Sequence, residues 1–212
     1  PNNASLVVAG DFNADEVRTW VDRYFGTIPK VELPERIKPE PRTLPQQSIV
    51  ETTDNVKIPL TLLVWHTPAA FQPGDAALDV VASILGEGRS SRLYADLITD
   101  KGQALEISAW QYSQTLGGVF ALTGKPAEGV TIEALEERLQ EHLNQLAKEG
   151  PTAEELERVQ NQLEVQFIGE LERLDQRASA LNRYHFLTGN PGYVDEDLSR
   201  YRAVSAEDVK AA

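Results

Sequence analysis

The segment LGEGRSSRLYADLITDKG, residues 85–102, holds the residue types from which several kinds of site are built. Its Gly-Glu-Gly triplet resembles a phosphate-binding turn, and the hydroxyls of Ser90 and Ser91 are possible nucleophiles. A phosphate loop, however, follows a strand and closes with Gly-Lys-Ser/Thr, and a nucleophilic serine sits in a Gly-x-Ser-x-Gly turn after a strand. Neither pattern occurs here. We therefore predict a turn that joins two helices, in which Ser90-Ser91 caps the second.

The histidines could ligate a metal only if they came together, since the chain has no cysteine. His66, His142 and His185 fall on separate predicted elements, and no pair has ligand spacing with a glutamate. His142 lies at the border of an apolar helical stripe, where we expect a partly solvated side chain. His185, between Tyr184 and Phe186, is expected to be a packing residue. The residues alone thus predict no metal site and no recognisable catalytic set.

The elements that surround these residues follow from apolar periodicity, glycine and proline breaks, and capping pairs such as Asn13 with Glu16 and Thr152 with Glu155. Helices are predicted over residues 14–25, 75–85, 91–98, 132–148, 152–171 and 178–187, and from 205 onward. Strands are predicted over residues 6–9, 49–53, 60–67, 107–112 and 119–123, with Gly117-Gly118 as a hairpin turn.

This order of elements predicts an α+β fold in which helices pack on one face of a mainly antiparallel sheet. Residues 29–45 contain five prolines and no apolar period, so we expect a linker there. Trp20 and Trp65 occupy core-like positions in their patterns, whereas the role of Trp110 stays open. The acidic stretch 133–141 is expected to be a solvated helix face.

Composition narrows the function classes. The chain has 212 residues with a net charge of −13, which disfavours a nucleic-acid partner. The lack of cysteine excludes disulfides, thiol catalysis and cysteine-ligated metal. No apolar run reaches the ~20 residues of a membrane span. The chain starts at Pro1 without a methionine or signal peptide, and we expect it to be a piece of a longer protein.

Several stretches carry a resemblance to a known family. They are PNNASLVVAGDFNADEVRTWVDRYFGTIP, HTPAAFQPGDAALDVVASILGEGRSSRLYADLI, KGQALEISAW, GPTAEELERVQNQLE and YRAVSAEDVKAA. Together, and in this order, they resemble the non-catalytic C-terminal domain of the insulinase/pitrilysin family of zinc peptidases, which includes the mitochondrial processing peptidase. In that family the segment at residues 85–102 joins two helices, which agrees with the prediction from its residues.

The resemblance implies a parent of two homologous α+β halves that enclose an unfolded peptide. An inverted H-x-x-E-H helix and a distal glutamate in the first half hold zinc, and the motif glutamate acts as general base. That segment would lie upstream of Pro1. Residues 1–30 would be the tail of the catalytic half, 31–46 a proline-rich linker, and 47–212 the second half-domain, truncated before its last strand.

The function so implied is that of a non-catalytic domain in a bacterial zinc endopeptidase, a hydrolase that degrades or processes peptides, where the domain helps to form the substrate chamber. A non-enzymatic scaffold subunit, resembling the core proteins of the family, is the alternative. The fragment alone is expected to be inactive and to bind no zinc. A periplasmic or exported location is expected for the parent, with the cytoplasm as the alternative.

The sequence departs from the family at one pair of positions. Many members carry an arginine and a tyrosine, seven residues apart, that bind the substrate backbone and stabilise the oxyanion. Aligned on Leu97, Gly102 and Ala104, these positions hold Ile98 and Leu105, and neither side chain can donate a hydrogen bond. Some bacterial relatives divide zinc and the Arg/Tyr pair between two chains. The resemblance therefore implies a partner subunit of the same family, in a heterodimer.

The family pattern also predicts a bare edge in the truncated sheet. Because unpaired edges recruit compatible strands, residues 5–9 are expected to complete the sheet. They would do so within their own chain or, as the alternative, by swapping into a second copy.

Overall fold

The computed structural model of the chain describes residues 2–35, 37–38 and 44–212. They belong to two compact units. The larger unit comprises Lys38–Asn161 and Arg200–Ala212, and the smaller comprises Pro1–Ile37 and Gln162–Ser199. The predicted linker falls partly on residues 36 and 39–43, which lie outside the described residues; its described part contains neither helix nor strand. The division at residues 30 and 46 stays a prediction.

A three-stranded antiparallel sheet lies in the larger unit, in the order β1-β3-β2. Its strands are β1 (Thr61–Thr67), β2 (Ala104–Ser113) and β3 (Gly118–Pro126). The predicted glycine turn joins β2 to β3, and the Gln114 N–H donates to the Gly117 carbonyl at 2.9 Å. Side chains alternate between the two faces along each strand, so register fixes which residues share a face.

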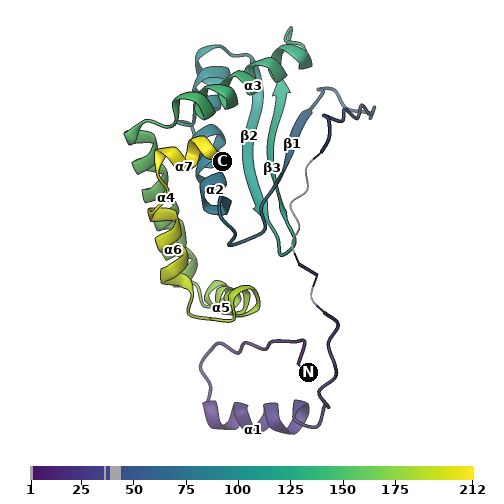
Figure 1. Cartoon of the computed structure of the whole chain (residues 1–212), viewed down its shortest axis with the longest axis vertical. Coiled ribbons are helices and arrows are strands. Elements are labelled where there is room, and N and C mark those ends of the chain that lie inside the picture. The colour runs from purple at the N-terminus through teal and green to yellow at the C-terminus, as the bar shows by residue number, and fades with distance from the viewer. Residues whose placement is uncertain (1, 36, 39–43) are drawn as a thin grey trace. The chain divides into compact units, whose positions relative to one another are not determined.

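Helices α2 (Asp75–Gly86) and α3 (Ile132–Glu149) lie on the same side of this sheet, and α7 (Ala206–Ala211) packs near both (Figure 1). A Cβ atom at Gly86 would lie 2.3 Å from the Ala109 nitrogen, and one at Gly124 would lie 2.8 Å from Leu135 Cδ2. Buried apolar side chains fill this layer: Val80, Ile84, Leu85, Phe120, Leu122, Leu135 and Leu139. The predicted α+β fold with helices on one face is confirmed.

Capping pairs set the helix starts as expected. Thr152 and Glu155 form a capping box at the start of α4 (Ala153–Glu172): the Thr152 N–H donates to Glu155 at 2.8 Å, and the Glu155 N–H donates to Thr152 Oγ1 at 3.1 Å. Ser205 and Asp208 form the corresponding box for α7. Such a cap satisfies helix N–H groups that have no partner within the helix.

The helix after the 85–91 turn is irregular. It is a π-helix, labelled η1, over Tyr94–Asp100, in which the Lys101 N–H donates to the Asp96 carbonyl at 2.9 Å. Leu93 and Leu97 are fully buried, as the predicted apolar stripe requires. π-Helical turns are rare and often occur at functional sites. The π-helical stretch is therefore a candidate part of a functional site.

The smaller unit contains α1 (Ala14–Phe25), α5 (Leu174–Thr188) and α6 (Val194–Arg202) as far as Ser199. The buried Tyr184 hydroxyl of α5 donates to Asp197 of α6 at 2.9 Å. Burial, together with this carboxylate, raises the pKa of Tyr184 above its ordinary range. Helix α6 was not predicted, although its acidic first turn and basic last turn match a helix dipole.

Two predicted strands are wrong. Residues 6–9 and 49–53 form no strand, and residues 5–9 pair with no sheet. Leu6, Val8, Ile49 and Val50 are all exposed. A β pattern becomes a strand only beside an edge that supplies hydrogen bonds, and these two segments meet none among the described residues. Completion of the sheet by residues 5–9, within the chain or by swapping into a second copy, stays a prediction, because these residues and the sheet belong to different units.

Candidate functional site

The turn at residues 85–91 is a connector. Ser91 is fully buried, and its Oγ donates to the Gly88 carbonyl at 2.8 Å, so this hydroxyl closes the turn and does not accept from the next helix. The expected capping role of Ser91 is wrong for that reason. A buried, hydrogen-bonded serine is also a poor nucleophile. The structure leaves the turn with an architectural role.

Arg92, directly after this turn, fixes the start of α4. Its Nε and Nη2 donate to the two oxygens of Glu155, each at 2.7 Å, and Nη2 also donates to the Gly150 carbonyl at 3.1 Å. This bidentate bond, helped by the Thr152 cap and opposed by burial, lowers the pKa of Glu155 to about 2. The same bond raises the pKa of Arg92. We call this pair the Arg92–Glu155 clamp.

A second charged cluster holds the π-helix against α3. The Asp96 carboxylate accepts from Lys101 Nζ at 2.8 Å, His142 Nε2 at 2.9 Å and Arg138 Nη2 at 3.0 Å. Burial alone would raise the pKa of Asp96, but these three donors outweigh it and lower the pKa below its ordinary value. Nothing in the sequence spacing pointed to this cluster, because Arg138 and His142 lie 42 and 46 residues from Asp96.

The histidines occupy three unrelated places. The side chain of His142 is 13% exposed and bonded to Asp96, so the expected partly solvated residue is more buried than predicted. His185 and Phe186 are exposed, and the packing role predicted for His185 is wrong; the neighbouring Tyr184 fills the core position. Among the described residues, no three histidine, aspartate or glutamate side chains are placed to hold a metal ion.

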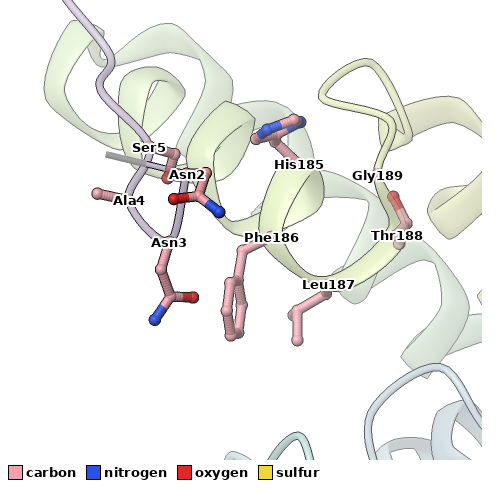
Figure 2. A pocket seen from close by; sticks show the side chains of 9 residues that line it. All are labelled: Asn2, Asn3, Ala4, Ser5, His185, Phe186, Leu187, Thr188 and Gly189. Carbon is pink, nitrogen blue, oxygen red and sulfur yellow. The ribbon is translucent and has the colours of Figure 1, made fainter. Parts of the chain in front are cut away.

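His185 lies beside the N-terminal segment in a hollow of about 450 Å³ (Figure 2). Asn2, Asn3, Ala4 and Ser5 form one side, and the C-terminal turn of α5 with Gly189 forms the other. Amides, hydroxyls and apolar groups surround the imidazole; the hydroxyls of Ser5 and Thr188 donate to Asn182 and to the Tyr184 carbonyl, and the described lining holds no carboxylate, lysine or arginine. This hollow does not contain a catalytic set.

A larger hollow of about 620 Å³ lies beside the start of α2 and is lined by Phe71, Arg200, Val204 and Asp208, among others. Arg200 Nη2 donates to the buried Asp75 carboxylate at 3.0 Å, and its guanidinium lies 4.8 Å from the Phe71 ring. Its charge is therefore engaged inside the fold. The remaining lining side chains are those of five alanines with Gln72, Pro73 and Gly74, and none of them is an acid, a base or a nucleophile.

The two positions that the family pattern marks lie in irregular backbone at the start of β2. Ile98 is half-buried within η1, and Leu105 is 52% exposed at the irregularity between Ala104 and Glu106, where the strand register shifts. Bulges of this kind occur often beside active sites. Both side chains are aliphatic, so whatever approaches this segment receives no side-chain hydrogen bond from these two positions.

The sheet has a second face, opposite α2 and α3, whose outer strands β1 and β2 carry exposed side chains, while Ala121 on the central strand β3 is fully buried. Residues of β1, β3 and β2 meet on it in three rows by register: Leu62, Thr123 and Ser108; Val64, Ala121 and Trp110; His66, Val119 and Tyr112. We call these nine residues the open sheet face. Leu62, Val64, Trp110 and Tyr112 are 52%, 47%, 39% and 58% exposed. Large exposed apolar groups that adjoin in this way mark interaction surfaces.

The three tryptophans lie in different surroundings. Trp65 packs on the helix-covered side, with its ring centroid 5.9 Å from that of Phe120. Trp20 is 53% exposed, so its predicted core position is wrong. Trp110 belongs to the open sheet face. The alternation of Ser108, Trp110 and Tyr112 along β2 was the sequence signal for this face.

No helix of the described chain is both long and apolar enough to cross a membrane.

Comparison with known proteins defines the class. The family profile described as the peptidase M16 inactive domain matches residues 1–163, and the chain belongs to this family. The resemblance drawn from the sequence is thereby confirmed.

Among curated relatives, the zinc protease PqqE of Helicobacter pylori is 27% identical over 175 residues, covering 81% of this chain and 39% of that protein. The uncharacterized zinc protease YmxG of Bacillus subtilis is 30% identical over 132 residues, covering 62% of this chain and 32% of that protein. The chain thus spans less than half the length of both relatives.

Solved structures share the fold. A protease from Helicobacter pylori superposes with a TM-score of 0.83 at 22% identity, covering 96% of this chain and half of that chain. The periplasmic protease PqqL of Escherichia coli gives a TM-score of 0.70 at 16% identity, covering 95% of this chain and 22% of that chain.

Proposed function

We propose that this chain is the non-catalytic half of a bacterial zinc endopeptidase that degrades or processes peptides, and that its open sheet face forms part of the substrate chamber wall. Membership of the inactive-domain family and the zinc proteases among its relatives support the enzyme class. The observation that carries the chamber role is the exposed apolar side of the sheet, opposite the helices, because an unfolded peptide presents apolar side chains that such a surface can cover.

Zinc would be held by residues outside this chain. The described residues contain no three-ligand cluster, and the Asp96–His142 contact is occupied by Arg138 and Lys101, whose positive charges disfavour a cation there. We therefore assign no catalytic step to these side chains. Their role in the reaction is to shape the space into which the peptide binds.

A partner subunit follows from Ile98 and Leu105. In the family alignment, an oxyanion that develops near this segment meets two aliphatic side chains, and a second family member that carries the arginine and tyrosine would supply the missing donors. An exported location is proposed as well, supported by the periplasmic protease of the same fold.

Purification of the complete protein tests the proposal. We expect stoichiometric zinc, cleavage of unfolded peptides, and loss of cleavage on treatment with a chelator, restored by added zinc. The 212-residue chain should cleave nothing under the same conditions. A complete protein that folds, lacks zinc and leaves unfolded peptides intact would contradict the enzyme and support the scaffold alternative.

A further inference from the structure

We propose that the open sheet face binds an extended peptide through bulky apolar side chains, and that Trp110 and Tyr112 determine this preference. The proposal rests on the proposed function and names the peptide chemistry that this surface selects. Trp110, Tyr112, Val64 and Leu62 supply most of its apolar contact area, since all four are large and about 40–60% exposed. Aromatic side chains of this kind dominate binding energy at interfaces.

The spacing of the face suits an extended chain. Same-face residues on a strand recur every ~6.6 Å, which is also the repeat of alternate side chains in an extended peptide. Trp110 and Tyr112 on β2 lie across from Val64 and His66 on β1, with the smaller Ala121 and Val119 of β3 between them. A peptide that runs along the strands can therefore place alternate side chains beside the exposed groups of β1 and β2, whereas Ala121 of β3 is fully buried and offers no contact area.

The net charge of the chain favours a peptide over a second copy of the chain as the ligand of the open sheet face. The ion pair of Lys125 with Glu106, at 2.7 Å, borders the face, and its two charges neutralise each other without a charge from the ligand. The chain as a whole carries −13, so two copies repel each other, whereas a basic peptide is attracted and a neutral peptide is not repelled. The favoured ligand is an extended peptide with aromatic or large aliphatic side chains and no net negative charge.

Binding of a labelled peptide to the 212-residue chain, followed by fluorescence anisotropy, tests the proposal. The probes are 15-residue synthetic peptides that differ only at two alternate central positions, with Phe and Leu in one and Ser and Ser in the other. We expect the Phe/Leu peptide to bind at least about tenfold more tightly, and Trp110→Ala to remove about tenfold of this affinity. In each peptide, two Lys flank these central positions. Replacing both by Glu should weaken binding, and the loss of affinity should be smaller at high salt than at low salt.

Trp20→Ala is the matched control, since it removes an exposed tryptophan of the smaller unit. Val64→Lys introduces a charge at a half-exposed position of the face, and circular dichroism verifies that each variant folds. The proposal is overturned if the Ser peptide binds equally well, if Trp110→Ala and Val64→Lys bind as the wild type does, or if Trp20→Ala weakens binding as much.

A concentration-dependent dimer that Val64→Lys dissociates would instead identify a second copy as the occupant and also overturn the proposal. These outcomes are separable from the proposed function: zinc-dependent cleavage by the complete protein can persist when the face shows no preference, and peptide binding can persist when cleavage is absent.

Discussion

The charge of Glu155 is stabilised by the fold, and this links stability to pH. Arg92 donates two hydrogen bonds to the carboxylate, and the Thr152 N–H donates a third. Because the folded pKa, about 2, lies below the ordinary value of 4.5, the folded state binds this proton less readily than the unfolded state. The contribution is therefore complete above about pH 4.5 and is lost as the pH falls towards 2.

Glu155→Gln should lower the free energy of unfolding at pH 7 by about 1–2 kcal/mol, the low end of the range for charged hydrogen bonds, since the pair is partly solvated. Glutamine keeps one oxygen for the Thr152 N–H, so the change leaves the cap in place and removes the charge together with one of the two acceptors of Arg92. The measurement is urea unfolding at several pH values: the difference between variant and wild type should shrink from pH 4.5 towards pH 2.

Asp175→Asn provides the control for this prediction. It removes a carboxylate from the Arg173–Asp175 pair, in which both side chains are about two-thirds exposed. Exposed pairs contribute little to stability, so we expect no measurable change at pH 7. Equal effects of the two substitutions would show that the Arg92–Glu155 clamp has no special strength.

At the scale of whole elements, two helical glycines should respond in opposite directions to alanine. Gly86 ends α2 against β2, where a Cβ would lie 2.3 Å from the Ala109 nitrogen and would force the helix off the sheet. Gly169 in α4 has open space around it. We expect Gly86→Ala to destabilise the fold by about 1–3 kcal/mol and Gly169→Ala to stabilise it by about 0.5–1 kcal/mol. Chemical denaturation of both variants, compared with the wild type, measures the two signs; destabilisation by both would refute the steric argument.

The sequence located the helices better than the strands, because the two depend on different partners. Capping pairs and breaks such as Gly150 are local, and α1, α3, α4 and α7 begin or end where these signals stand. A strand depends on a neighbour that the local pattern does not contain. For this reason the patterns at residues 6–9 and 49–53 predicted strands that the structure does not show. The π-helix was not predictable either, since its buried Leu93 and Leu97 fit an α-helical spacing equally well.

In the candidate site, too, local features could be predicted and contacts between distant segments could not. The connector role of residues 85–91 was predictable from the sequence. The Asp96 cluster could not be predicted, because His142 and Arg138 reach it from another helix. The open sheet face becomes visible only once the register aligns β1 with β2 across β3.

At the scale of the whole molecule, the chain should fail as a metalloenzyme by itself. Among the described residues His66, His142 and His185 are separated, and no third ligand joins any of them. After incubation with zinc and dialysis, we expect a substoichiometric metal content, together with no cleavage of unfolded peptides. One zinc per chain, lost in a variant of any of the three histidines, would contradict this prediction.

The proposed division of work between two subunits gives the sharpest test of Ile98 and Leu105. Leu105 is half-exposed, and Ile98 is half-buried in the π-helix, so both positions can carry a long polar side chain with its head in solvent. In the complete protein, Ile98→Arg with Leu105→Tyr should raise peptide turnover without a partner, since one oxyanion donor is commonly worth about 10²–10³ in rate. Ile98→Met with Leu105→Phe, which adds bulk but no donor, is the matched control and should change little. The partner subunit should stimulate the wild type strongly and the Arg/Tyr variant weakly. If the wild type turns over peptide equally with and without the partner, the two subunits do not divide the reaction.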